Sequence, residues 1–84
     1  MIYGLYAILD AKSCFMPCTP DTNDMTAVRN FKHAVNAPGS LMAESPTDFA
    51  LYKIGEMDDT IGELWPCTPT KKLCDAAQCL NKEV

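Results

Sequence analysis

Basic side chains are a minority in this 84-residue chain, and histidine occurs only once. Seven lysines and arginines stand against eleven aspartates and glutamates, so the net charge is −4. A protein that binds the phosphate backbone of nucleic acid normally carries an excess of lysine and arginine on the contact surface. The acidic balance argues against that class unless basic residues gather on one surface. No acid or nucleophile lies at a telling spacing from His33 and no glycine-rich phosphate loop occurs, so we expect no enzyme.

The cysteines argue against both a disulfide framework and a metal site. They number five, which is odd, and no two have the Cys-x-x-Cys spacing. A tetrahedral zinc site would therefore need distant cysteines to converge. We expect reduced cysteines that act as small apolar residues in a cytosolic protein, with no bound metal or cofactor.

Neither a secretory signal nor a membrane span is evident. Asp10 interrupts the first apolar run, no basic region precedes it, and no stretch reaches the roughly 18–20 apolar residues of a span. Hydrophobic residues make up 48% of the chain, as in globular proteins. A domain of this size buries only about 60–65% of its unfolded surface. We therefore expect one domain, residues 1–84, whose core is completed by a partner, commonly a second copy.

A short internal repeat is the best guide to the fold. The tetrapeptide Pro-Cys-Thr-Pro occurs at residues 17–20 and again at residues 66–69. A Leu-Tyr-x-Ile pattern precedes the two copies, at residues 5–8 and 51–54. Such self-similarity suggests two related halves, residues 1–36 and residues 48–84, joined by a small, polar linker at residues 37–47.

In the first half, residues 2–9 are apolar, aromatic or β-branched and predict a strand. A polar turn at residues 10–13 and a short return strand at residues 14–16 follow. Residues 21–24 offer several N-cap side chains for a helix that should end near Asn36, because Pro-Gly follows.

In the second half, residues 48–57 predict a strand, and Gly55 within it suggests a bulge or a close backbone approach. A turn at residues 58–60 and a return strand at residues 61–65 follow. Thr68 as N-cap and Pro69 at the first helical position predict a second helix. Its apolar stripe consists of Leu73, Ala76, Ala77 and Leu80.

The order strand, strand, helix thus occurs twice. Two such ββα units predict an α+β fold with a four-stranded antiparallel sheet and both helices on one face. The other face of the sheet is then exposed or paired with another subunit.

Four sequence patterns resemble those of the small nonstructural protein of gokushovirus-type microviruses, phages with single-stranded DNA genomes. The patterns lie at residues 6–10 with 15–17, at residues 27–31, at residues 46–52, and at residues 54–58 with Gly62. Their order and spacing extend over most of the chain. The chain departs from the family pattern at Leu9 and Cys18, where aromatic residues are usual, and this weakens a role in base stacking.

The resemblance implies a viral protein that acts in the cytoplasm of the infected bacterium. Members of this family are often described as DNA-binding proteins that assist single-stranded DNA synthesis, or the switch from duplex replication to genome packaging. For this chain we expect the same class of activity.

Three groups of residues are candidates for contact with DNA. The first is a sheet face on which Tyr3, Phe49 and Lys53 could form a stacking and phosphate-binding surface, with Lys12 at a hairpin end. The alternative is that these aromatic residues belong to the core or to a dimer contact.

The second group is the start of the predicted second helix, where Thr68, Thr70, Lys71 and Lys72 cluster. Free backbone N–H groups there favour an anion, whereas two lysines oppose the helix dipole unless an anion binds. The alternative is a pair of solvated surface lysines.

The third group is the outer face of the first helix, with Arg29, Lys32 and His33. Arg29 and Lys32 are three residues apart and share a surface, so either could contact phosphate. The alternative is that Arg29 pairs with an acidic residue such as Asp48 or Asp58.

The sequence therefore predicts an auxiliary viral protein that assists phage single-stranded DNA replication or packaging by weak or partner-assisted binding of single-stranded DNA. The expected DNA contacts are Lys12, Arg29, Lys32, Lys53, Lys71 and Lys72. The alternative is a homodimeric interaction module that regulates viral or host replication proteins without contacting DNA. No membrane contact is expected in either case.

Overall fold

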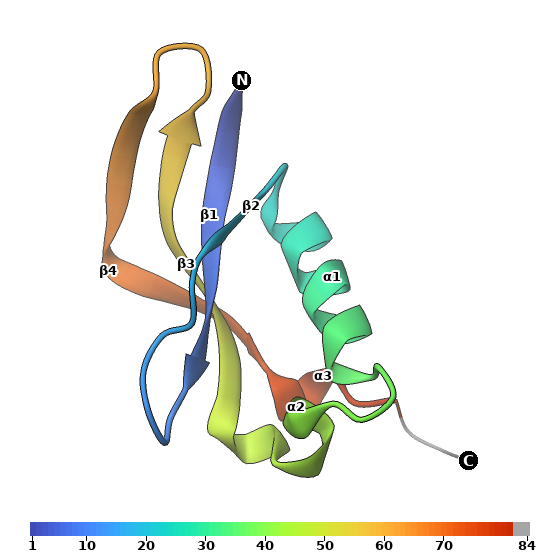
Figure 1. Ribbon diagram of the computed structural model, residues 1–84. Coiled ribbons are helices and arrows are strands. Elements are labelled where there is room, and N and C mark those ends of the chain that lie inside the picture. The colour runs from blue at the N-terminus through green and yellow to red at the C-terminus, as the bar shows by residue number, and fades with distance from the viewer. Residues whose placement is uncertain (82–84) are drawn as a thin grey trace.

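The structure is a computed structural model and describes residues 1–81. Its centre is a four-stranded antiparallel sheet in the order β2-β1-β3-β4 (Figure 1). The strands are β1 (Ile2–Asp10), β2 (Thr19–Asp21), β3 (Phe49–Asp58) and β4 (Glu63–Asp75). The predicted α+β class and four-stranded antiparallel sheet are confirmed.

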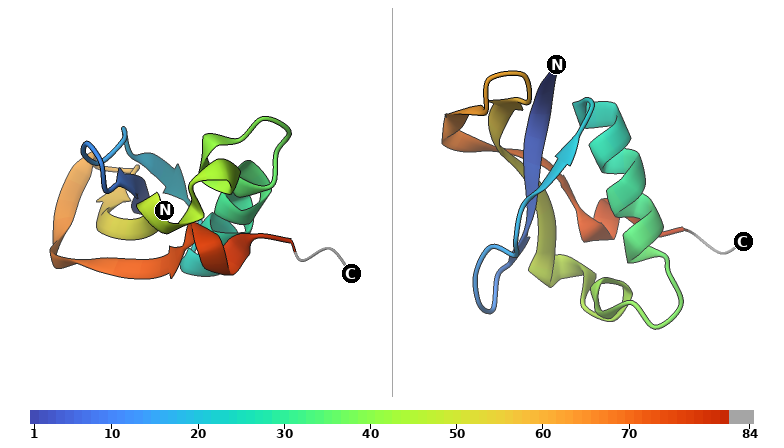
Figure 2. Two further views of the ribbon diagram at one scale, coloured as in Figure 1. Left: turned by 90° about the horizontal axis from the view of Figure 1, so that it is seen from below. Right: turned by 45° about the horizontal axis from the view of Figure 1, so that its top comes forward.

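Three helices lie to one side of this sheet, as Figures 1 and 2 show. They are α1 (Asp24–Val35), α2 (Leu41–Glu44) and α3 (Ala76–Cys79). A 3-10 turn, η1 (Pro46–Asp48), connects α2 to β3, so short helical segments occupy most of the predicted linker. Among the helices of residues 1–81, the longest has 12 residues, and none is long and apolar enough to cross a membrane.

Helix α1 follows from local sequence signals. The side chain of Asn23 caps it by accepting a hydrogen bond from the backbone N–H of Thr26 at 2.8 Å. Ala27, Phe31 and Val35 recur at helical spacing and are all buried against the sheet. The helix ends at Val35, so the predicted start and end are confirmed.

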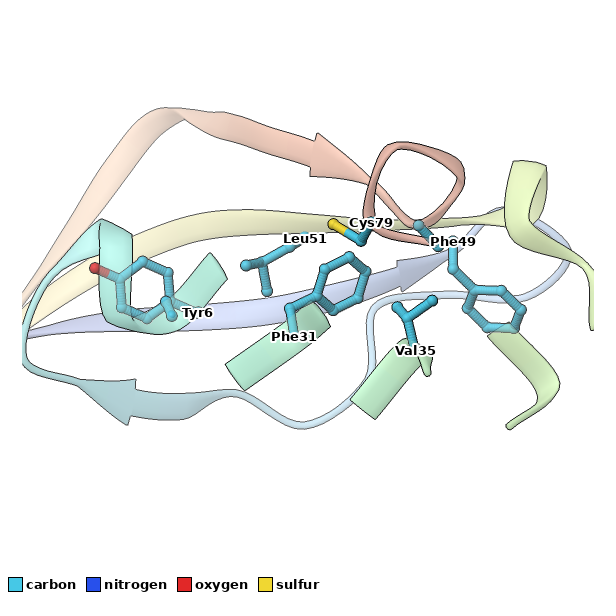
Figure 3. Close-up of a cluster of buried hydrophobic side chains, with 8 residues drawn as sticks. Tyr6, Phe31, Val35, Phe49, Leu51 and Cys79 are labelled. Atoms are coloured by element: carbon cyan, nitrogen blue, oxygen red, sulfur yellow. The ribbon is translucent and has the colours of Figure 1, made fainter. Parts of the chain in front are cut away.

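The core lies between α1, α3 and the helix-facing side of the two central strands (Figure 3). Leu51 of β3, Phe31 of α1 and Cys79 of α3 lie near the middle of this core, with Tyr6 of β1 at one end and Phe49 beside Val35 at the other. Because this core is small, only a few side chains hold α1 against the sheet.

The two Leu-Tyr-x-Ile segments lie side by side in the central strands. Ile8 is opposite Leu51, Ala7 is opposite Tyr52 and Tyr6 is opposite Lys53, after which the register shifts by one residue. The pairing of β3 with β4 is also irregular between Lys53 and Gly55. A β-carbon on Gly55 would lie 2.7 Å from the carbonyl oxygen of Trp65 on β4. The predicted bulge or close backbone approach at this glycine is confirmed.

Both Pro-Cys-Thr-Pro segments reach the outermost strands of the sheet. Pro20 is in β2, and Pro66 and Pro69 are in β4. Proline has no backbone N–H and is tolerated at sheet edges, where it opposes pairing with another strand. Both edges of the sheet are therefore poor templates for edge-to-edge association.

The prediction of a helix from Thr68 is wrong. Residues 63–75 form one long strand, and α3 is a single turn whose capping box joins Asp75 and Gln78. Residues 71–75 pair with residues 50–53 of β3, which gives the backbone of that strand hydrogen-bonding partners that a helix would not provide. Of the predicted apolar stripe, Ala76 is buried and Leu73 and Leu80 pack against the core, whereas Ala77 is exposed.

The predicted return strands also differ from the structure. In the first half, the predicted return strand at residues 14–16 is reduced to an isolated bridge between Phe15 and Leu9. The strand that pairs with β1 is β2, which begins only at Thr19, after Pro17. In the second half the return strand begins at Glu63 and continues through the second tetrapeptide. The two halves are therefore built differently after their first strands.

One end of the sheet extends beyond the helices. This part, which we call the arm, consists of residues 1–4 and 56–65 and forms the top of the molecule in Figure 1. The molecule is accordingly elongated, with extents of 46 × 25 × 18 Å.

Candidate nucleic-acid interface

Asp24, the first residue of α1, gathers three side chains from the sheet. Its Oδ1 accepts a hydrogen bond from the Tyr6 hydroxyl at 2.7 Å. Lys53 Nζ lies 3.8 Å from the same oxygen, and Lys71 Nζ lies 3.5 Å from Oδ2. The register explains this convergence, because Tyr6, Lys53 and Lys71 are opposite one another on β1, β3 and β4.

The charges in this cluster support one another. The hydrogen bond from Tyr6, followed by the charges of Lys53 and Lys71, lowers the pKa of Asp24. Burial, followed by the hydrogen bond to Asp24, raises the pKa of the Tyr6 hydroxyl. The ionised carboxylate also lies at the positive end of α1, which favours it further. Both lysines are thus paired with a carboxylate of the same chain.

The expected stacking surface on one sheet face is not assembled. Lys53 lies on the helix side, where its side chain is 21% exposed and also approaches Glu56 at 3.8 Å. Phe49 is buried in the core on the same side. Tyr3 is three residues from Tyr6 on an alternating strand, so it lies on the opposite face.

The expected anion site at a second helix has lost its structural basis. Lys71 and Lys72 lie within β4, so no helix N-terminus is available at this position. Lys72 Nζ lies 2.6 Å from a carboxylate oxygen of Asp75, and this hydrogen bond raises the pKa of Lys72. Both lysines are therefore engaged with carboxylates.

Lys12 stands apart from the other candidates. It is exposed in the turn after β1, where its backbone N–H donates to Asp10 Oδ1 at 3.0 Å. This turn and α1 lie on different sides of the sheet (Figure 1). Lys12 is accessible to a ligand but does not join a basic cluster.

Arg29 and Lys32 form the clearest basic surface. Both are exposed on α1 and, with His33, Asn36 and Asn81, they line a hollow of about 300 Å³. Within residues 1–81 neither of them forms an ion pair with a carboxylate.

The acidic partners considered for Arg29 are placed elsewhere. Asp58 lies 3.8 Å from the α-amino group of Met1, and Asp48 belongs to η1 at the start of β3. The two ion pairs considered for Arg29, with Asp48 and with Asp58, are therefore not formed.

Asn36 gives the hollow a fixed wall. Its Nδ2 donates to the carbonyl oxygens of Lys32 and Cys79, each at 2.8 Å. Its Oδ1 accepts from the backbone N–H of Asn81 at 2.9 Å. These bonds join the end of α1 to the segment after α3, so the basic side chains project from a rigid base.

A second depression adjoins this basic surface and is mainly apolar. It has a volume of about 440 Å³ and is lined by Met25, Val28 and Leu73, with Arg29 and Lys32 at its border and Asp24 at one end. We call it the α1 groove. The same two cations therefore border both a polar hollow and an apolar one.

Trp65 is an exposed aromatic residue that the sequence reasoning did not select. It lies on the arm, where 41% of its surface is exposed, opposite Glu56. By contrast, exposed Phe15 packs edge-on against Tyr52, with ring centroids 5.3 Å apart. As the only tryptophan in the chain, placed just before a proline, Trp65 had a sequence signal that marked it.

Comparison with known protein families identifies the family of this chain. The family model described as Phage ORF5 protein matches residues 3–79. The chain belongs to the Phage ORF5 protein family. Its membership confirms the expected phage origin of the sequence pattern, and the matched range contains the Asp24 cluster, the basic face of α1 and nearly all of the arm.

Searches of curated proteins and of solved structures returned no match.

Proposed function

We propose that this ORF5 protein is a non-enzymatic accessory protein of a phage with a single-stranded DNA genome. It acts in the cytoplasm of the host bacterium, during replication or packaging, and binds single-stranded DNA weakly. The observation that supports this proposal is the exposed pair of Arg29 and Lys32 on α1, which is without a carboxylate partner in residues 1–81 of an otherwise acidic chain. The resemblance to the gokushovirus-type nonstructural protein supplies the viral context.

The ion pairs of the six basic candidates favour some of them over others as DNA contacts. Lys53, Lys71 and Lys72 would have to leave a carboxylate before they could bind phosphate, which makes them poor contacts. Arg29 and Lys32 are available without rearrangement, and Lys12 lies away from them. We therefore propose about two phosphate contacts per protein, which accounts for weak binding.

The number of contacts can be read from the salt dependence of binding. For single strands the slope of log K against log salt concentration is about −0.7 per phosphate contact. Two contacts predict a slope of about −1.4 and a loss of affinity of about sevenfold between about 50 and 200 mM salt. Contacts from all six basic residues would give a slope of about −4 and a loss of roughly 300-fold.

The experiment is a fluorescence-anisotropy titration of a labelled single-stranded oligonucleotide at several salt concentrations. Replacing both Arg29 and Lys32 with alanine should abolish most of the binding and flatten the salt slope. Lys71→Ala is the matched control, because it removes an exposed charge that is already paired, and it should leave the affinity nearly unchanged. Absence of binding by folded protein at low salt would refute the proposal, as would equal effects of the two substitutions.

A second candidate function is supported by the arm. Ile2, Ile61, Leu64 and Trp65 are all exposed there, an unusual concentration of large apolar side chains at one end of a small protein. Such a surface suits an interaction module that associates with itself or with viral or host replication proteins. If the oligonucleotide does not bind, this function remains.

A further inference from the structure

The arm combines apolar side chains with negative charge. Besides its exposed apolar residues it carries four carboxylates, from Glu56, Asp58, Asp59 and Glu63. No lysine, arginine or histidine occurs in residues 1–4 or 56–65. The single cation of the arm is the α-amino group of Met1, which is already paired with Asp59 at 2.6 Å.

The α1 groove has the opposite charge and the same apolar character. Met25 is 82% exposed at its rim, and Arg29 and Lys32 border it. Carboxylates of the arm and cations of the groove would attract each other, and the apolar residues of both would leave water on contact. The two surfaces are therefore complementary in charge and in polarity.

The arm and the α1 groove lie at the same end of the molecule. A depression of about 510 Å³ separates them, with Ile2 and Glu56 on the arm side and Asp24 and Met25 on the helix side. Two complementary surfaces that adjoin on one chain can satisfy each other twice across a two-fold axis, which closes the assembly at a dimer. The prolines at both sheet edges oppose the alternative in which copies pair strand to strand.

We propose that two copies of this chain form a two-fold dimer in which the arm of each copy lies in the α1 groove of the other. This inference specifies the self-association named in the second candidate function, and it does not require that DNA binds. Because the arm covers Arg29 and Lys32, the dimer and a DNA strand compete for the same cations. Self-association thereby regulates access to the proposed DNA-contact face.

Charge exchange between the two surfaces tests the arrangement. One variant carries Arg29→Glu with Lys32→Glu, and the other carries Asp59→Lys with Glu63→Lys. Each variant alone meets like charges at both contacts, so its dimer should be weakened roughly a hundredfold or more. In an equimolar mixture both contacts again join opposite charges, and the dimer should return as a mixed species. Lys12→Glu, a reversal outside both surfaces, is the matched control and should dimerise like the unmodified protein.

The measurements are sedimentation velocity over a wide concentration range and the emission of Trp65, the only tryptophan. Dimer formation should shift this emission to shorter wavelength as concentration rises. A monomer at every concentration, variants that dimerise normally, or a mixture that stays monomeric would each overturn the proposal. Particles that grow beyond a dimer would replace the two-fold arrangement with a head-to-tail one and so refute it.

Addition of the oligonucleotide separates this inference from the proposed function. If DNA binds to the Arg29 and Lys32 face, it should convert dimers into monomers. If DNA does not bind, the charge-exchange result is unaffected and stands alone. A ternary complex that retains the dimer would contradict the shared use of these cations.

Discussion

Replacing Asp24 with alanine should destabilise the fold because it removes the acceptor that joins α1 to the sheet. Tyr6 is only 3% exposed, and its hydroxyl bonds to Asp24 at 2.7 Å. In the variant the buried Tyr6 hydroxyl loses its hydrogen-bond acceptor, and such a loss lowers the free energy of unfolding by about 1–3 kcal/mol.

Other contributions of Asp24 are smaller. A carboxylate in the first turn of a helix contributes about 0.3–1 kcal/mol through the helix dipole. The ion pair with Lys71 is largely solvent-exposed, so it adds little. The expected total is about 2–3 kcal/mol, which corresponds to a fall in Tm of roughly 10–20 °C for a domain of this size.

The assay is urea unfolding followed by circular dichroism and by the emission of Trp65. Glu44→Gln, which removes an exposed carboxylate from the short helix α2, is the control and should change stability by less than about 0.5 kcal/mol. A double-mutant cycle with Tyr6→Phe should give a coupling of about 1 kcal/mol or more. A loss below about 0.5 kcal/mol for Asp24→Ala, or strict additivity with Tyr6→Phe, would show that the cluster does not hold the helix in place.

Three further predictions follow from other features. The pKa of Asp24 is lowered in the folded state, so its contribution to the free energy of unfolding is present above the unfolded pKa of about 3.9 and is lost as pH falls below it. The stabilities of the protein and of Asp24→Asn, measured against pH, should therefore converge only at low pH, and parallel curves would contradict this. Gly55→Ala should cost about 1–3 kcal/mol in urea unfolding, because its β-carbon would lie 2.7 Å from a backbone oxygen, and an unchanged midpoint would disprove the close approach. Burial raises the pKa of the Cys74 thiol to about 12, and its Sγ lies 3.6 Å from that of Cys79. Iodoacetamide labelling followed by mass spectrometry should therefore modify exposed Cys14 at least about tenfold faster than Cys74, and equal rates would argue against the packing of this pair.

Local signals were sufficient to predict α1 and the central strands. A capping asparagine, the spacing of Ala27, Phe31 and Val35, and the Pro-Gly that follows all act within a few residues of α1. The apolar and β-branched run of the first strand and the glycine irregularity of the third were equally readable. These features depend on short-range sterics and on one apolar face, which a sequence records directly.

The second predicted helix failed because its apolar spacing has two structural solutions. Leu73, Ala76 and Leu80 reach the core from the end of a strand followed by a single helical turn. Two lysines in the first turn of the predicted helix, Lys71 and Lys72, opposed its dipole and were a signal against it. Pairing with β3, a contact over about twenty residues, decided the outcome.

The site was harder to predict than the fold. Tyr3 lies on the opposite face from Phe49 because Tyr6 is the residue of β1 that is opposite Lys53, and the register between two distant strands cannot be read from either strand alone. Lys53 itself follows Phe49 and Leu51 in regular alternation, ahead of the one-residue irregularity. Its partner Asp24 comes from a different element, so neither local pattern nor spacing could join them. The shared surface of Arg29 and Lys32 could be predicted because both residues lie on one helix, where spacing in sequence is spacing on a surface.

The pairing of β1 with β3 has a consequence for biosynthesis. Ile8 and Leu51 are opposite each other but 43 residues apart (51 − 8 = 43), so β1 leaves the ribosome roughly 2–9 s before its main neighbour is made. During that interval only the three residues of β2 are available to pair with it. The apolar first strand is thus the segment of the nascent chain most exposed to aggregation and chaperone capture, and the rate at which the phage message is translated sets how long that exposure lasts.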